Sequence, residues 1–200
     1  MSEAPSRPHR GDPDRAPDGA VEVIDRVAEL RARLDGTRAE GLSVGLVPTM
    51  GALHQGHLSL IRRATDECDV VAVTVFVNPL QFAPGEDLAT YPRTLDADLD
   101  VVAEGGGDIV FAPSEAEMYP DPSPATTAAT ASGRFGVLTD VYEGRSRPGH
   151  FGGVATVVAR LFDAAGACRA YFGEKDWQQL LVVRRLVDDL SLPVDVVACP

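Results

Sequence analysis

Apolar positions occur in blocks along the chain, and their spacing predicts alternating strands and helices. Short, almost continuous apolar runs predict buried strands at 42–47, 69–77, 108–112, 170–172 and 194–198. Apolar residues at helical spacing predict helices over 21–35, 57–67, 94–104, 154–165 and 176–190. This alternation predicts an α/β fold with a doubly wound, mainly parallel, five-stranded sheet.

The polar stretches predict how the domain is bounded. Residues 1–20 are rich in Pro, Asp and Arg, which predicts a disordered tail before a single domain over 21–200. Residues 78–92 contain three prolines and a glycine and predict a loop. The irregular stretch 114–149 includes a low-complexity segment at 121–133, and so long a loop is expected to cover a site.

Three predicted strands end in polar residues, at Pro48–Thr49, at Asn78 and at Gly173. In doubly wound sheets, ligands bind beyond the carboxyl ends of the strands. The first of these ends leads into PTMGALHQGH, where His54 and His57 stand three residues apart at the start of a predicted helix. Free N–H groups and the helix dipole make such a start a phosphate site, so this turn indicates nucleotide chemistry.

Composition limits the classes of partner. The net charge of −12 and the pI near 4.6 disfavour binding to nucleic acid or to an anionic membrane. The three cysteines Cys68, Cys168 and Cys199 are far apart, which favours buried free thiols in a reducing compartment. No apolar run reaches the roughly 18 residues of a membrane span, and no secretory h-region is present, so we expect a cytoplasmic protein.

The sequence has no G-x-G-x-x-G and no P-loop motif, but H-x-G-H at a strand-to-helix turn marks class I nucleotidyl-transferring enzymes with a Rossmann-like fold. On spacing alone, one structural and one surface histidine explain the motif equally well. The neighbouring blocks decide between them: PTMGALHQGHLSLI, VFVNPLQFAPGEDLATYPRTLDADL, FAPSEAEMYP, EGRSRPGHFGGVATVVARLF and RAYFGEKDWQQLLVVRRLVDDLSLPVDVV. In this order, over about 42–200, they resemble the pantothenate synthetase family.

The resemblance implies a reaction. It implies ATP-dependent condensation of pantoate with β-alanine through a pantoyl adenylate, with release of AMP and pyrophosphate. It further implies a Mg²⁺-dependent adenylation step and a cytoplasmic homodimer. Metal ligands are not assigned by it.

The resemblance also implies roles for particular residues. His57 is expected to be the proton-donating catalytic residue, with His54 as its partner and Lys175 as a charge for phosphate. Gln81 is expected to contact pantoate and later β-alanine, Gln179 to contact pantoate, and Asn78 to lie in the pocket. The expected ATP-binding residues are Met50, Gly51, Ala52, Leu53, His54, Gln55, Gly56, His57, Gly173, Glu174, Lys175 and Asp176.

Other roles stay open. Arg145, Arg147 and His150 either face the pocket or brace the long loop, and residue type favours neither. Asn78 before Pro79 is also the ordinary start of a turn. Trp177 stands where the family commonly has tyrosine, and we expect it to pack rather than to act in catalysis.

Several alternative functions also remain. Family members carry a Ser-Ser-Arg-Asn-type nucleotide loop and a smaller C-terminal domain that these 200 residues do not contain, so one alternative is a domain that binds ATP and pantoate with little turnover. A second is another H-x-G-H enzyme that adenylates a phosphorylated cofactor precursor. A third is a fragment of a class I aminoacyl-tRNA synthetase, which the acidic pI disfavours. The last is a non-catalytic domain that binds pantoate or nucleotide and dimerises.

Overall fold

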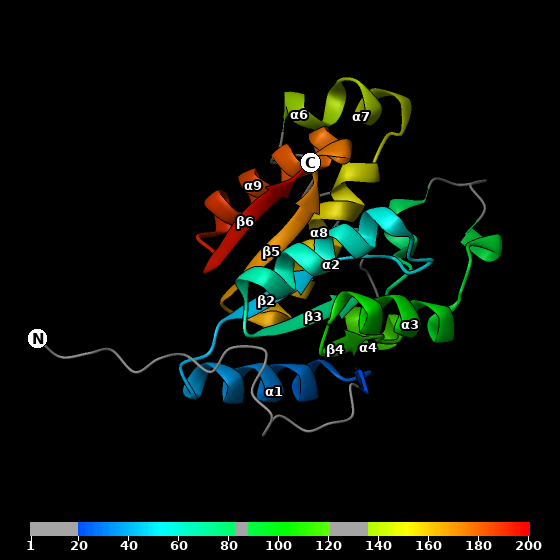
Figure 1. Cartoon of the computed structure of the whole chain (residues 1–200). Coiled ribbons are helices and arrows are strands. Elements are labelled where there is room, and N and C mark those ends of the chain that lie inside the picture. Colours follow the sequence, from blue (N-terminus) through cyan, green and yellow to red (C-terminus); the bar gives the residue numbers. More distant parts are fainter. Residues whose placement is uncertain (1–19, 83–87, 121–135) are drawn as a thin grey trace, which may run out of the picture.

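Six parallel strands form one sheet in the computed structural model, which describes residues 20–82, 88–120 and 136–200 (Figure 1). Their order across the sheet is β1-β4-β3-β2-β5-β6. The strands are β1 Glu22–Ile24, β2 Val44–Val47, β3 Val70–Thr74, β4 Ile109–Phe111, β5 Cys168–Gly173 and β6 Val194–Cys199. The pairing of β2 runs through Gly45 and Leu46 to Arg169 and Ala170 of β5, which joins the two halves of the sheet.

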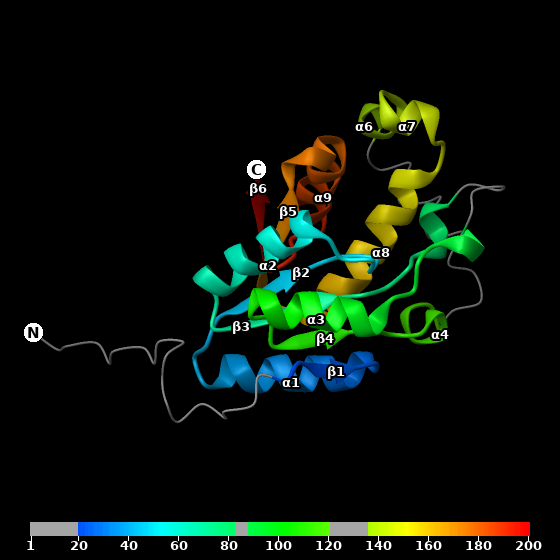
Figure 2. The same ribbon diagram turned by 45° about the vertical axis from the view of Figure 1, so that its right-hand side comes forward.

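Helices cover both faces of this sheet (Figures 1 and 2). One face is covered by α1 Val27–Ala39, α8 His150–Ala165 and α9 Trp177–Leu190, whose buried side chains join those of the strands in one apolar cluster. The other face is covered by α2 Gln55–Glu67 and α3 Leu95–Gly105, around a smaller cluster. The predicted doubly wound α/β fold is therefore confirmed, with a sixth strand added to the five expected.

That sixth strand corrects the prediction at the beginning of the domain. We expected one helix over 21–35, but residues 22–24 form β1, and α1 begins only at Val27. β1 pairs in parallel with β4, as Ile24 aligns with Phe111. Val23 and Ile24 are β-branched and suit an edge strand, so pairing with β4 overrides their helical spacing.

The remaining segments are short. The predicted loops contain α4 Glu115–Met118, α6 Val137–Asp140, α7 Glu143–Ser146 and the 3-10 turns η1 Pro79–Gln81 and η2 Leu88–Thr90. A third 3-10 turn, η3 Glu174–Asp176, joins β5 to α9. The predicted tail at 1–19 and the low-complexity segment at 121–133 lie outside the described residues. Within the described part of the chain, no helix has the length and apolar character needed to cross a bilayer.

The topology fixes where a ligand can bind. From β2 the chain proceeds to β3 on one side, whereas from β5 it proceeds to β6 on the other. A crevice opens at such a reversal, outside the carboxyl ends of the two strands. β2 leads into the histidine turn, β5 leads into Gly173–Asp176, and β3, the neighbour of β2, leads towards Asn78. The three predicted junctions are thus adjacent in the sheet.

Candidate active site

The turn between β2 and α2 is held in an unusual backbone conformation. Gly51 and Ala52 both have positive φ, of 85° and 51°, a region that is costly for alanine. His54 then returns to an extended conformation and becomes the N-cap of α2. The turn therefore delivers two imidazoles and the first N–H groups of α2 to the same place.

The two histidines cap the helix reciprocally. The Nδ1 atom of His54 accepts a hydrogen bond from the Gly56 N–H at 3.1 Å, and the Nδ1 atom of His57 accepts one from the His54 N–H at 3.3 Å. The rings stack with their centroids 4.1 Å apart. Because each Nδ1 accepts, a neutral ring carries its proton on Nε2 and offers that N–H as a donor.

The surroundings of His57 favour the neutral ring. Burial, reinforced by the neighbouring His54, lowers the pKa of His57 to about 4. Asp98 and Asp176 act in the opposite direction but are outweighed. At neutral pH His57 is therefore a hydrogen-bond donor without a positive charge.

Asp98, in α3, is a site carboxylate that no sequence motif predicts. It is buried, and its two oxygens accept the N–H groups of Ala52 at 3.1 Å and Leu53 at 2.7 Å. A buried carboxylate needs such partners, and a backbone at positive φ needs support from outside the turn. Asp98 thus fixes the turn that carries the histidines.

The second junction lies between β5 and α9. Gly173, Lys175 and Asp176 all line the same cavity as the histidines. The Lys175 side chain is 86% exposed, and its Nζ lies 4.0 Å from an Asp176 oxygen. Lys175 is therefore an exposed cation at the rim of the cavity, suited to an anionic ligand entering from solvent.

The third junction, η1, packs against α8. A Cβ at Gly153 would lie 2.0 Å from the Leu80 carbonyl oxygen, so only glycine allows this approach. Asn78 is buried beneath the turn and accepts the Leu80 N–H through its own side chain. Gln81 lines the cavity, whereas Asn78 does not.

Together these junctions enclose a cavity of about 280 Å³. Its lining includes most of the predicted residues, namely Met50, Gly51, His54, Gly56, His57, Gln81, Gly173, Lys175, Asp176 and Gln179. Five predicted residues do not line it, namely Ala52, Leu53, Gln55, Asn78 and Glu174, so the expected pocket position of Asn78 is wrong. Ala52 and Leu53 instead donate their N–H groups to Asp98.

The apolar wall was not predicted. It includes Leu60, Phe76, Tyr171, Phe172 and, on α8, Val154, Val157, Val158 and Leu161. The helical spacing of the α8 residues identifies an apolar face, but spacing alone does not distinguish a face against the core from one against a cavity.

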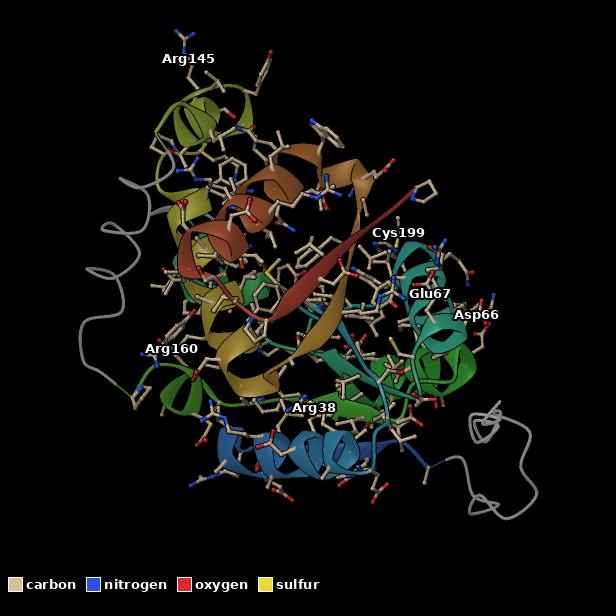
Figure 3. All side chains as sticks on the ribbon, turned by 90° about the vertical axis from the view of Figure 1, so that its left-hand side faces the viewer. Arg38, Asp66, Glu67, Arg145, Arg160 and Cys199 are labelled. Atoms are coloured by element: carbon tan, nitrogen blue, oxygen red, sulfur yellow. The ribbon has the colours of Figure 1, made fainter. Side chains whose placement is uncertain are left out.

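The arginine-containing segment before α8 braces the site rather than entering it. Arg147 and His150 both hold the Gln81 carbonyl oxygen, at 3.3 and 3.0 Å, so the bracing alternative is correct for these two. Arg145 is exposed and points away from the domain in Figure 3. Trp177 is 54% exposed, so the packing role expected for it is wrong.

Two further expectations concern cysteine and metal. The three cysteines are buried and free, as predicted; Cys199 lies at the end of β6 beside α2 (Figure 3). Among the described residues, no three His, Cys, Asp or Glu side chains gather closely enough to hold a metal ion. This part of the chain thus offers no ready-made cage of protein ligands for a cation.

The fold, the switch point and the histidine-capped helix start define a Rossmann-like domain of the H-x-G-H nucleotidyltransferase type. The comparison with known proteins gives the particular family. The family model described as pantoate-beta-alanine ligase matches residues 22–200, and the chain belongs to this family.

Relatives with known names agree with this assignment. Pantothenate synthetases of Paracoccus denitrificans and Cereibacter sphaeroides are 53% and 55% identical over 178 and 177 residues, which are 89% and 88% of this chain. The chain spans only 61% of the length of each.

Solved structures agree as well. Pantothenate synthetase from Thermus thermophilus superposes with a TM-score of 0.77 at 50% identity, covering 90% of this chain and 62% of that one. The pantoate-beta-alanine ligase of Francisella tularensis, described as a complex with beta-gamma ATP and beta-alanine, gives 0.79 at 36% identity, covering 90% and 67%.

Proposed function

We propose that this chain forms the ATP- and pantoate-binding part of a pantothenate synthetase. The observation that carries the proposal is the meeting of three junctions, β2–α2, β3–η1 and β5–α9, around one cavity at the switch point. The reaction is the condensation of pantoate with β-alanine, driven by ATP. The family membership supports the reaction, and the cavity supports the roles below.

ATP binds between the two helix starts. The N-terminus of α2 and Lys175 together supply the positive potential that a triphosphate needs. The Met50–His57 turn and Gly173–Asp176 form opposite sides of this subsite. The Francisella tularensis relative, whose structure is described as a complex with beta-gamma ATP, supports the assignment.

His57 and His54 stabilise the charge that develops as pyrophosphate leaves. With each Nδ1 used in capping, both rings direct an Nε2–H donor away from the helix backbone. Such donors are already oriented before the reaction and need no reorganisation during it. We therefore replace the expected proton-donating role of His57 by hydrogen-bond donation from a neutral ring.

Pantoate lies on the side of Gln81 and Gln179. Both residues line the cavity, and their amides suit the carboxylate and hydroxyl groups of a hydroxy acid. The valines of α8 supply an apolar wall that suits the two methyl groups of pantoate. Asn78 contributes by holding Gln81 rather than by touching the substrate.

The chemistry has two halves. A pantoate carboxylate oxygen attacks the α-phosphorus of ATP, a P–O bond forms, and the bond to the leaving pyrophosphate breaks. The uncharged amine of β-alanine then attacks the acyl carbon of the adenylate, so that a C–N bond forms and the bond from the acyl carbon to the bridging oxygen breaks. AMP leaves with that oxygen, and the new amide nitrogen loses a proton to water or to the phosphate of AMP. The protein contributes alignment and charge stabilisation.

Mg²⁺ fits this site as an ion that binds together with the phosphates of ATP. The ion keeps several waters and takes one or two carboxylates when it binds with a nucleotide, so it needs no cage of protein ligands. Asp176 is a carboxylate that lines the cavity beside Lys175. When bound, Mg²⁺ would neutralise phosphate charge. Removal of the ion with EDTA is expected to weaken ATP binding in calorimetry.

Homodimerisation and a cytoplasmic location are part of the same proposal. They rest on the family resemblance. Sedimentation equilibrium tests the first: a mass of about twice 21.2 kDa supports it, and a concentration-independent mass of one chain contradicts it.

The identity of the molecule that ATP adenylates tests the proposed function. We expect the protein to bind ATP and pantoate in calorimetry and to form pantothenate when β-alanine is added. A preference for a phosphomonoester acceptor over pantoate would instead support another H-x-G-H nucleotidyltransferase. Binding of both ligands without any adenylate would support a non-catalytic domain.

A further inference from the structure

A chain of side-chain hydrogen bonds runs from the protein interior to the cavity. The hydroxyl of Tyr119, just after α4, donates to Asn78 Oδ1 at 2.7 Å. Asn78 Nδ2 in turn donates to Gln81 Oε1 at 2.9 Å. Tyr119 and Asn78 are buried, and Gln81 lines the cavity.

Backbone groups fix the direction of this chain. The Leu80 N–H donates to Asn78 Oδ1 at 3.2 Å, and Asn78 Nδ2 donates to the Gly153 carbonyl at 3.1 Å. A backbone N–H only donates and a carbonyl only accepts, so the Asn78 amide has one orientation. Turning it over would put donor against donor and acceptor against acceptor.

The orientation of Asn78 determines that of Gln81. Because Asn78 presents its NH₂ group, Gln81 must present its oxygen to Asn78. The NH₂ group of Gln81 is then available to donate to a ligand in the cavity that this residue lines. The backbone of Gln81 is also held, since its carbonyl oxygen contacts His150 and Arg147. Both ends of the residue are thus constrained before any ligand binds.

We propose that Tyr119 is a positioning residue that, through Asn78, fixes the Gln81 amide with its NH₂ group towards an oxygen of the hydroxy-acid substrate. The inference rests on the proposed function for the identity of that acid. In this orientation the Gln81 side chain is a hydrogen-bond donor. It therefore favours a carboxylate or hydroxyl oxygen of the ligand over an ammonium group.

Two properties of Tyr119 suit the role. Burial raises the pKa of Tyr119, so the hydroxyl stays protonated and able to donate at any pH at which the protein works. Its ring packs edge-on against Phe76, with the centroids 6.0 Å apart. Tyr119→Phe therefore removes the donor while leaving the ring contact in place.

Steady-state kinetics of Tyr119→Phe test the proposal. We expect the KM for pantoate to rise about tenfold, the usual effect of one hydrogen bond, while the KM for ATP changes less than about twofold. Tyr142→Phe is the control, because Tyr142 is 87% exposed. Equal changes in both KM values would indicate a general structural defect and overturn the proposal.

A double-mutant cycle adds a second readout. Gln81→Glu keeps an oxygen for Asn78 but removes the donor to the cavity, and we expect the KM for pantoate to rise at least about 100-fold. In that background Tyr119→Phe should add less than about twofold, because there is no longer a donor to position. Independent, multiplicative effects of the two substitutions would contradict the proposal.

NMR of the side-chain amides separates this proposal from the proposed function. The Asn78 NH₂ protons should exchange slowly with solvent in the free protein and faster in Tyr119→Phe. Slow exchange in a protein that does not bind pantoate would leave the positioning role intact and overturn the substrate assignment. Exchange of Asn78 as fast as that of an exposed amide would overturn the positioning role itself.

Discussion

At the scale of single residues, the histidine pair combines a structural role in capping α2 with the chemical role that we propose for it. Capping groups usually belong to Ser, Thr, Asp or Asn, whose short side chains keep their polar atoms close to the helix backbone. An imidazole has two nitrogen atoms, so Nδ1 can cap while Nε2–H remains available. The short spacing of H-x-G-H follows from this double use, since the second ring must reach back to the N–H of the first.

The lowered pKa of His57 predicts how stability depends on pH. Below pH 6.5 the unfolded chain binds a proton at this ring, whereas the folded chain does so only near pH 4. The stabilisation is therefore present above pH 6.5 and is lost as the pH falls from 6.5 to 4. Between about pH 7.5 and about pH 5, this ring should lower the free energy of unfolding by about 2 kcal/mol.

Urea unfolding of the wild type and of His57→Gln at the two pH values measures this contribution. The variant should lose about 2 kcal/mol less than the wild type over the same interval. The same pH dependence in both proteins would show that His57 titrates normally.

Asp98 supports a turn that the residues of the turn do not favour on their own. Asp98→Ala leaves the N–H groups of Ala52 and Leu53 without a buried acceptor, and we expect it to cost about 3 kcal/mol in the free energy of unfolding. ATP affinity should fall too, because the turn ends at the capping histidine. Asp100→Ala, an exposed change on the same helix, should alter stability by less than about 0.5 kcal/mol. Equal effects of the two substitutions would exclude the support role.

At the scale of elements, the central strands were predictable and the edge was not. β2 and β3 are continuous apolar runs buried on both faces, a pattern that needs no tertiary information. β1 has only three residues and depends on pairing with β4, which lies about 85 residues away in the sequence. The local spacing of apolar residues carries no information about pairing with a distant strand. For residues 22–24 this spacing therefore predicts a helix.

The contact between α8 and η1 gives a prediction of its own. Gly153→Ala would drive a Cβ into the Leu80 carbonyl, so one of the two elements must move. We expect a loss of about 2 kcal/mol of stability and weaker pantoate binding, because Gln81 moves with η1.

Gly36→Ala in α1 is the matched control: its Cβ would meet open space, and it should stabilise by up to about 1 kcal/mol. Calorimetric titration with pantoate would reveal the difference, and unchanged binding in Gly153→Ala would show that η1 tolerates the shift.

At the scale of the whole molecule, the site depends on the order of strands more than on any single motif. The junctions after β2, β3 and β5 are far apart in the sequence, and the sheet makes them neighbours. That His54, His57, Gln81 and Lys175 line one cavity was predictable, because they follow strand ends and stand in blocks that resemble the family. Asp98 was not, because an acidic residue near a helix start is ordinarily explained by the helix dipole.

In the proposed reaction, pantoate is activated by ATP at the histidine turn. Isotope exchange between pyrophosphate and ATP measures that step without β-alanine. We predict exchange that requires pantoate, falls about 10²- to 10³-fold in His57→Ala and is unchanged in Asp66→Asn, an exposed change on the same helix. Exchange that proceeds without pantoate would show that pantoate is not the group activated at this turn, and exchange at the wild-type rate in His57→Ala would exclude His57 from the step.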